Sequence, residues 1–559
     1  MLFTAPVFLL VFLPVTLAGF LLLRSRPAWC VPWLLAASML FYAWWSPIFL
    51  LVLVASTLVN WGLARAIEGA RGQNLTSVIP DLGASREPGI HDRVSGREQI
   101  TAQSWIPGSP AAPRNDGETA WDDVRAIHPA APPPSPTLPR KGGGGPARAI
   151  LVLGLAWNLG LLAYFKYADF FITTANQVAG THWVLLNVVL PLGISFFTFQ
   201  KIAYLVDVYR GAARAGRLLD FALFVFFFPQ LIAGPIVHHA EVRPQLARLA
   251  QGAAHERNAV WENLAVGLTL LAMGLAKKLF VADTLALYAT PVFEAAADGR
   301  TIGLLPAWQG ALAYTGQLYF DFSGYSDMAV GLARMFGVRL PQNFASPYQA
   351  TSIVEFWRRW HMTLSRFLRD YLYIPLGGGR QGAARRSLNL MTVMLLGGLW
   401  HGAGWTFVVW GGLHGLYLLV AHAWRGLSFP PLPTLIGWAL TMLAVTVAWV
   451  VFRAADLPSA GAVLSGMLGL NGLAELPGAK RGTGLLLALA ALAAAATLPN
   501  TQTILRAYHP VLEPIPEPTG RVARLLWQPH PALAAGAAAI LVAAVLSGWS
   551  ATEFLYFQF

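Results

Sequence analysis

Charged side chains are scarce in this sequence of 559 residues. Asp, Glu, Lys and Arg together make up 12% of the chain, whereas hydrophobic residues make up 56%. A soluble domain usually has about 25% charged residues, and no soluble fold of this size could keep so much apolar surface from water. The composition therefore excludes an ordinary soluble enzyme, a disordered chain and a small secreted scaffold, and a polytopic membrane protein remains.

Cysteine is almost absent, because Cys30 is the only one. An intrachain disulfide, a cysteine zinc site and an iron–sulfur cluster are thereby excluded. His238, His239 and His414 are conceivable metal ligands together with His401, but the histidines lack i, i+4 pairing and HExxH spacing, so we expect no metal. A serine nucleophile in a GxSxG elbow is missing as well.

Positive charge is in excess, with 39 Lys and Arg against 27 Asp and Glu, a net charge of +12. No basic patch with interleaved aromatics stands apart from the apolar segments, so we expect no nucleic-acid partner. Cationic loops that hold a membrane protein in its orientation explain the excess better.

Long apolar stretches recur along the chain. A helix that crosses a bilayer needs about 20 such residues, which predicts an all-α polytopic membrane protein with about 11–13 transmembrane or re-entrant helices. Short stretches with Gly or Pro are expected to be broken helices that line a protein-enclosed cavity. The stretches are Leu2–Leu23, Val31–Trp45, Pro47–Ala64, Ile150–Tyr164, Leu185–Leu205, Leu218–Ile236, Trp261–Leu279, Leu304–Tyr319, Leu388–Trp400, Trp405–Ala421, Leu435–Phe452, Gly484–Leu498 and Ala532–Leu546.

Basic residues in the loops predict the orientation. The first apolar segment lacks a basic region before it and a cleavage site after it, so we do not interpret it as a cleavable signal peptide. Arg24 and Arg26 follow it, which places the N-terminus outside and the first loop in the cytoplasm. We expect a multi-pass protein of the bacterial inner membrane.

One polar stretch, from about Gly69 to Arg148, interrupts the apolar sequence. It contains runs such as Pro132-Pro-Pro-Ser-Pro136 and Gly142-Gly-Gly-Gly145 and lacks helical periodicity. We interpret residues 69–148 as a disordered cytoplasmic insertion; a docking segment or a regulatory tail is the alternative. It would separate N-terminal transmembrane helices (1–68) from a catalytic core (149–430) and C-terminal transmembrane helices (431–559).

Polar residues gather between about Tyr314 and Tyr417. The first cluster is Tyr319-Phe-Asp-Phe-Ser-Gly-Tyr-Ser-Asp327. A carboxylate at membrane depth is costly. Asp321 is therefore either a buried carboxylate that orients a site or an acid paired to an arginine such as Arg334 or Arg339. For Asp327 we favour the ion pair.

The second cluster is Phe356-Trp-Arg-Arg-Trp-His-Met-Thr-Leu-Ser-Arg-Phe-Leu368. At about 100° per residue it predicts an amphipathic helix, with Trp357, Trp360 and His361 on the apolar arc and the arginines opposite. Arg358 and Arg359 could hold anionic lipid heads or the phosphates of a cofactor. A lone histidine on an apolar arc is more often a satisfied core residue than a catalyst.

The third cluster is Leu395-Leu-Gly-Gly-Leu-Trp-His-Gly-Ala-Gly-Trp405. His401 lies there in apolar sequence, and an ionisable residue at membrane depth is a candidate functional residue. Imidazole can take a proton from a hydroxyl near neutral pH, which suits a general base. The alternative is a histidine that is hydrogen-bonded between helices.

These clusters, taken in order, resemble the membrane-bound O-acyltransferase family. The closest resemblance is to its bacterial branch with the alginate O-acetyltransferase membrane subunit and the D-alanyl transfer protein of teichoic-acid modification. The matching segments are Phe228-Pro-Gln-Leu-Ile-Ala-Gly-Pro-Ile236, Tyr319–Asp327, Pro341-Gln-Asn-Phe344, Phe356-Trp-Arg-Arg-Trp-His361, Tyr373-Ile-Pro-Leu-Gly-Gly-Gly379, Leu399-Trp-His-Gly402 and Phe554-Leu-Tyr-Phe-Gln-Phe559.

The resemblance implies helices around a central tunnel and an O-acyltransferase activity. His401 would be the general base and His361 an orienting residue, with Asp321 as a supporting carboxylate and Arg358, Arg359 and Trp360 near the donor. The donor would be acetyl-CoA or another acyl-thioester, with no cofactor bound permanently.

The implied acceptor is a secreted polysaccharide such as alginate, reached through a periplasmic acetyltransferase partner, and membrane lipid surrounds the chain. Alternatives are D-alanyl, lipid or peptidoglycan acyl transfer, and a polytopic transporter or export subunit. A transporter often has repeated halves, and none is evident here.

Overall fold

The computed structural model describes residues 2–76, 145–251, 257–473, 483–517, 525–547 and 554–555. Every regular secondary-structure element in these ranges is a helix. Six helical stretches there are long and apolar enough to cross a membrane, which confirms the all-α polytopic prediction. They are Phe8–Ser25, Pro47–Arg71, Pro146–Ala179, Ala259–Ala297, Trp405–Gly426 and Thr434–Arg453.

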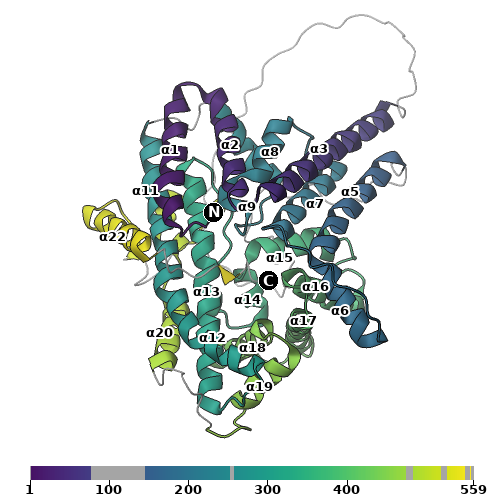
Figure 1. Cartoon of the computed structure of the whole chain (residues 1–559), viewed down its shortest axis with the longest axis vertical. Helices are drawn as coiled ribbons and strands as arrows, with labels where there is room; N and C mark the ends of the chain where they lie inside the picture. Colours follow the sequence, from purple (N-terminus) through teal and green to yellow (C-terminus); the bar gives the residue numbers. More distant parts are fainter. Residues whose placement is uncertain are drawn as a thin grey trace, which may run out of the picture.

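The N-terminal helices occupy the top and the right of the molecule as seen in Figure 1. In this part α3, α5 and α7 pack against one another, and large apolar side chains such as Leu51 (68% exposed) and Leu153 (61%) point outward, as expected for a lipid-facing surface. The elements are α1 (Leu13–Leu22), α2 (Cys30–Ala43), α3 (Pro47–Thr76), α5 (Pro146–Leu162), the π-helical turn η4 (Ala163–Tyr167), α6 (Ala168–Ala179) and α7 (Ile194–Arg210).

Two predicted spans differ from the structure. The stretch from Leu185 is irregular as far as Gly193, which has a φ of +74°, and α7 begins only after it. Pro191 two residues earlier disfavours a helix through this segment. The stretch from Leu218 to Ile236 is broken at Phe227, before Pro229, into α8 (Leu218–Phe226) and α9 (Phe228–Leu231). Helix α10 (His239–Ala250) follows.

The longest helix is α13 (Leu304–Met335), which runs through the middle of the molecule (Figure 1). The apolar pattern predicted that it ends at Tyr319, but it continues for sixteen further residues that include both aspartates of the first cluster. Helices α11 (Arg257–Ala276) and α12 (Asp283–Ala297), joined by the π-helical turn η5 (Lys277–Ala282), pack along it. These partners cover its polar residues, so the helix needs no apolar sequence there.

Glycines bring α11 and α13 close together. A Cβ atom on Gly267 would lie 2.6 Å from the carbonyl oxygen of Gly331, and one on Gly274 would lie 2.5 Å from that of Gly324. Small residues at facing positions are the usual way for helices in membranes to pack backbone against backbone.

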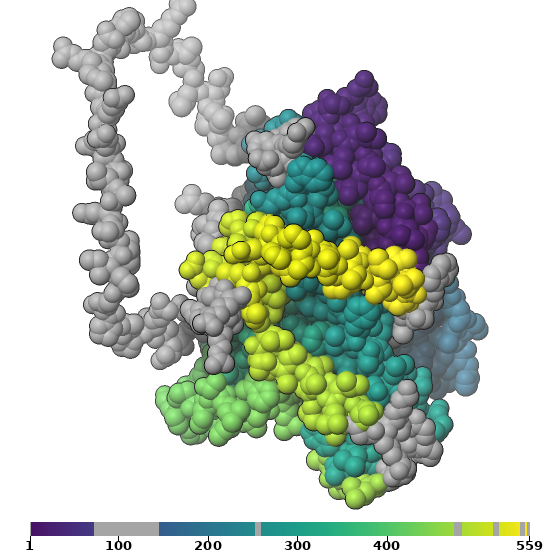
Figure 2. Space-filling view, turned by 90° about the vertical axis from the view of Figure 1, so that its left-hand side faces the viewer, coloured from purple at the N-terminus to yellow at the C-terminus, as the bar shows by residue number. Residues whose placement is uncertain are grey.

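The remaining helices complete the other side of the molecule and its outer surface. Figure 2 shows α22 lying across the outside of the molecule, where it packs on α11. The elements are α14 (Ile353–Arg359), α15 (Met362–Leu368), α16 (Gly382–His401), α17 (Trp405–Gly426), α18 (Thr434–Arg453), α19 (Leu457–Met467), α20 (Thr483–Thr497), α21 (Thr501–Ile504) and α22 (Pro531–Ser547).

The predicted insertion is only partly within the described residues. Helix α3 continues past Gly69 to Thr76, and α5 begins at Pro146, so both ends of the predicted segment are helical. Residues 77–144 lie outside the described residues, and the role given to them stays a prediction, as does the central tunnel.

Candidate active site

His361 lies at a break between two short helices. α14 ends before Trp360, which is extended, and α15 begins after His361, whose φ and ψ of 44° and 52° are left-handed. The prediction of one continuous helix is wrong at these two residues, because left-handed backbone cannot continue a right-handed helix. A bulky residue held in this conformation is strained, and such strain is concentrated at functional sites.

The imidazole of His361 is fully buried and held by Asn343. Its Nδ1 lies 3.0 Å from Asn343 Oδ1, which also accepts a hydrogen bond of 2.8 Å from the hydroxyl of Thr363. Because Asn343 Oδ1 is an acceptor, Nδ1 of His361 carries the proton in the neutral ring and Nε2 carries the lone pair. Nε2 is buried and has no hydrogen-bond partner among the described residues. The ring therefore has one nitrogen fixed and one basic nitrogen left for a ligand.

His401 is the last residue of α16, where Gly402 turns the backbone to an extended conformation. Its side chain is buried, at 5% exposed. Trp410 of α17 and Phe452 of α18 present their rings nearly perpendicular to the imidazole, at centroid distances of 5.0 and 5.4 Å. Two neighbouring helices thus wall the imidazole with aromatic rings, a setting that excludes bulk water.

The structure brings the two predicted histidines together. The rings of His361 and His401 lie 6.4 Å apart between centroids, although the residues are forty positions apart in the sequence. A third histidine, His414, is fully buried nearby and packs on Trp410 at 4.8 Å, while its Nδ1 accepts a hydrogen bond of 3.3 Å from Trp357. The pair of His361 and His401 is close enough for both rings to contact one reacting group.

Asp321 has a different environment from the histidines. Its carboxylate forms an ion pair of 2.8 Å with Lys278, which also binds Asp283 at 2.7 Å, and accepts a hydrogen bond of 3.0 Å from the backbone of Leu555. Within the described residues it contacts neither histidine by a hydrogen bond. Lysine, rather than the arginines considered in the sequence, is its partner.

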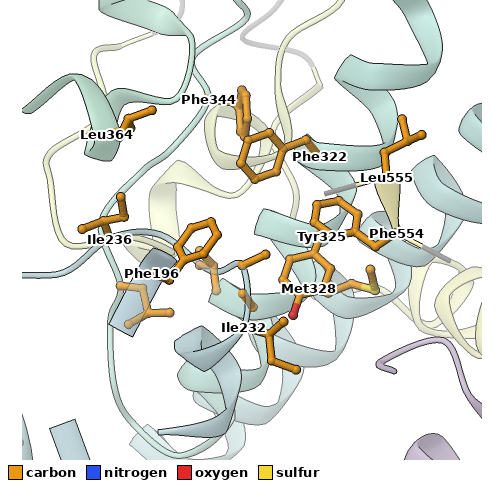
Figure 3. Close-up of a cluster of buried hydrophobic side chains, with 14 of the residues drawn as sticks. Phe196, Ile232, Ile236, Phe322, Tyr325, Met328, Phe344, Leu364, Phe554 and Leu555 are labelled. Atoms are coloured by element: carbon orange, nitrogen blue, oxygen red, sulfur yellow. The ribbon is translucent and has the colours of Figure 1, made fainter. Parts of the chain in front are cut away.

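Residues near the C-terminus pack into the core beside Asp321. Phe554 stacks on Tyr325 with ring centroids 4.5 Å apart and lies 5.7 Å from Phe322 (Figure 3). Phe322 in turn meets the ring of His361 nearly perpendicularly at 4.8 Å. Asp321 therefore adjoins the histidine site through these rings.

Asp327 is also held by a lysine. Lys277 lies 2.6 Å from its carboxylate, and Thr501 and Gln502 of α21 donate to it at 2.7 and 2.6 Å. The ion pair predicted for Asp327 is confirmed, but not with an arginine: Arg334 binds Glu262 instead, at 2.8 Å.

The predicted donor-binding residues occupy two environments. Arg359 is partly exposed and binds Glu355 at 2.6 Å, and its neighbour Arg358 is also partly exposed. Trp360 is buried between rings and stacks on Phe356 at 5.6 Å. The first two lie where a ligand could reach them, whereas Trp360 belongs to the core.

Arg366 does not join those arginines at the surface. It forms two hydrogen bonds of 2.6 and 3.0 Å with the carboxylate of Glu241, which anchors α15 to α10. Burial raises the pKa of Glu241, but the nearby guanidinium and the imidazole of His238 lower the pKa by more, so the carboxyl stays ionised.

Asn343, the partner of the His361 imidazole, is not predicted as a site residue from the sequence. An amide in a segment such as Pro341-Gln-Asn-Phe344 is a candidate partner for a buried imidazole, because buried polar groups are hydrogen-bonded. The two residues are 18 positions apart in the chain, and periodicity within one helix does not pair them.

Comparison with known proteins shows the family to which the sequence is similar. The model of the MBOAT family, the membrane-bound O-acyltransferases, matches residues 214–455, which include both histidines. The peptidoglycan O-acetyltransferase of Helicobacter pylori is 38% identical over 505 residues, covering 85% of this chain and 81% of that protein. The chain belongs to the membrane-bound O-acyltransferase family. It is a multi-pass membrane O-acyltransferase.

Other relatives carry different substrates in their names. The probable alginate O-acetylase of Pseudomonas aeruginosa is 38% identical over 462 residues, covering 82% of this chain and 73% of that protein. The teichoic acid D-alanyltransferase of Streptococcus thermophilus is 27% identical over 241 residues, covering 42% of this chain and 57% of that protein. The chain is therefore more nearly identical to the O-acetylating relatives than to the D-alanyltransferase, and it matches them over a larger share of its length.

Proposed function

We propose that this O-acyltransferase transfers an acetyl group from a cytoplasmic thioester, acetyl-CoA, toward a hydroxyl of a secreted polysaccharide such as alginate. His401 is the general base. The observation that carries the proposal is the buried pair of His401 and His361, whose rings lie 6.4 Å apart. The names of the O-acetylating relatives support acetyl as the group that is transferred.

The reaction needs one proton transfer and one acyl transfer. The imidazole of His401 removes the proton of the acceptor hydroxyl while that oxygen forms a bond to the acetyl carbonyl carbon. The carbon–sulfur bond then breaks, the thiolate leaves, and the proton on the imidazole passes to it or to solvent. A site walled by aromatic rings keeps out water, which would otherwise hydrolyse the thioester.

His361 is the orienting residue in this scheme. Asn343 fixes its Nδ1 proton, so that the lone pair of Nε2 is available to accept a hydrogen bond from the acceptor hydroxyl or from His401. Asp321 supports the site indirectly, through the rings that pack between it and His361. We assign Arg358 and Arg359, which are partly exposed, to the phosphates of the donor.

We infer the setting of the reaction from the family resemblance and from the basic loops. We place the protein in the bacterial inner membrane with its N-terminus outside, so that the donor comes from the cytoplasm. A periplasmic acetyltransferase partner then takes the acetyl group from the hydroxyl that is acylated at His401 and delivers it to the polymer. No permanently bound cofactor is needed.

A second candidate acceptor is peptidoglycan. It is favoured by the relative from Helicobacter pylori, whose match covers 85% of this chain. The step at His401 would be the same, because only the final acceptor differs and it is again a sugar hydroxyl.

One experiment tests the proposal. Acetyl content of the secreted polysaccharide and of peptidoglycan is measured in cells with the wild-type protein, His401→Ala or no copy, with membrane levels matched by immunoblot. His422→Ala is the control, since this buried histidine lies near the other end of the α16–α17 pair. We expect His401→Ala to match the deletion, with polymer export unchanged.

The results separate the alternatives. Loss of acetyl from the polysaccharide alone supports the main proposal, and loss from peptidoglycan alone assigns the second acceptor. Equal acetylation of both polymers in all strains would overturn acetyl transfer to either one.

A further inference from the structure

Lys166 lies inside an apolar helical stretch that is long enough to cross a membrane, Pro146–Ala179. An ammonium group at membrane depth is costly and is retained where it has partners and a function. In this structure Lys166 turns toward the end of α16. Its Nζ donates hydrogen bonds of 2.8 and 3.0 Å to the carbonyl oxygens of Trp400 and His401.

Tyr167, the next residue in the chain, also binds the C-terminal end of α16. The hydroxyl of Tyr167 donates a hydrogen bond of 2.8 Å to the carbonyl oxygen of Leu399. The last four carbonyl groups of a helix have no partner within the helix. Two consecutive side chains thus satisfy three of the four that end α16, and they come from the π-helical turn η4, a type of turn often found at functional sites.

Charge adds to the hydrogen bonds. The C-terminus of a helix carries a partial negative charge of about half an elementary charge, so a cation there is stabilising. The ammonium of Lys166 binds the last two carbonyl groups of α16, and the second of them belongs to His401 itself. The third donor of the ammonium points to the hydroxyl of Ser195, 3.4 Å away. An ammonium group has three donors, so all of them are used within the protein.

We propose that Lys166 is a positioning residue, whose ammonium group caps the C-terminus of α16 and holds the imidazole of His401 in its catalytic position. Tyr167 assists through Leu399. The proposal rests on the proposed role of His401 as general base. Because its donors are taken, Lys166 acts through the backbone and does not touch the substrate.

The test uses membranes of the native host that carry the full chain, and it measures transfer of labelled acetyl from acetyl-CoA to the polymer fraction. Lys166→Met removes the charge and the donors at similar length. A misplacement of about 1 Å can lower a rate roughly 100-fold, so we expect kcat to fall by roughly 10- to 100-fold. The KM for acetyl-CoA should not change, because donor binding is not affected.

Three further variants separate positioning from general damage. Lys166→Arg keeps the charge and the donors and should restore most of kcat. Tyr167→Phe removes one hydroxyl and should give a smaller loss. Lys201→Met is the matched control, because Lys201 is also a buried lysine, but its ammonium donates to the hydroxyl of Ser56 in α3 at 3.0 Å.

Each contrary outcome has a distinct meaning. An unchanged kcat in Lys166→Met, or an equal fall in Lys201→Met, would overturn the positioning role. Absence of only the Lys166→Met protein from the membrane would assign Lys166 to assembly instead and also overturn it. If His401→Ala itself transfers acetyl normally, the proposed function fails, whatever the lysine variants do.

Discussion

Gly398→Ala offers a sharp test of the geometry around His401. Gly398 lies on α16, nearly one turn before the histidine, where α16 crosses α17. A Cβ atom there would lie 2.2 Å from the carbonyl oxygen of Phe407 and 3.1 Å from Gly411, and both contacts are with backbone. Backbone atoms cannot rotate away as a side chain can, so the two helices must separate.

The size of the effect follows from those distances. Real Cβ atoms essentially never approach closer than 3.0 Å, so the contact of 2.2 Å must open by about 0.8 Å. A displacement of about 1 Å at a reacting group costs roughly 100-fold in rate. We therefore expect Gly398→Ala to lower acyl transfer by roughly 10- to 100-fold, although alanine is the better helix former by about 1 kcal/mol.

The assay is acetyl transfer by membranes with matched protein levels, and Gly412→Ala is the control. Gly412 lies on α17, and a Cβ there would meet only a side-chain atom of Leu395, at an ordinary 3.6 Å. This control should keep its activity. Equal activity in the two variants would refute the argument that the α16–α17 contact sets the position of His401.

Three further variants address other contacts. Asn343→Leu removes a hydrogen bond worth about 1 kcal/mol from His361, so transfer should fall roughly fivefold; an unchanged rate would contradict the orienting role. Lys278→Met removes the ion-pair partner of the buried carboxylate of Asp321 and of the partly buried carboxylate of Asp283, and should destabilise the protein by about 3–5 kcal/mol, measured by thermal unfolding in detergent; adding Asp321→Asn should restore part of the loss. Arg358→Ala with Arg359→Ala should raise the KM for acetyl-CoA, whereas an unchanged KM would favour contact with lipid.

Hydropathy predicts the bounds of helices well where they face lipid and poorly where they are surrounded by other helices. The exposed stretches, such as α3 and α22, begin within one residue of their predicted starts. In α13 the apolar sequence stops at Tyr319, yet the helix continues to Met335, because α11, α12 and Lys277 cover its polar side chains. The hydropathy of the residues in one segment does not indicate which other segments of the chain pack against it.

The sequence singles out the two histidines of the candidate site but does not predict their geometry. His401 is recognisable as an ionisable group in apolar sequence, and His361 through the family motif. Helical periodicity in the sequence does not reveal a residue with left-handed backbone such as His361. The periodicity therefore predicts a continuous helix. The lysine partners of Asp321 and Asp327 come from a π-helical turn between α11 and α12, about 45 residues away in the sequence, and hydropathy does not pair distant charges.

The hydrogen bond between Asp321 and Leu555 has a consequence for biosynthesis. The two residues are 234 positions apart in the chain, and ribosomes add about 5–20 residues per second. Roughly 10–50 s therefore pass between the synthesis of the carboxylate and the synthesis of its backbone partner. During this interval α13 is already made while one of its buried polar contacts is still missing, so the insertion machinery or a chaperone has time to act on this region before the core closes.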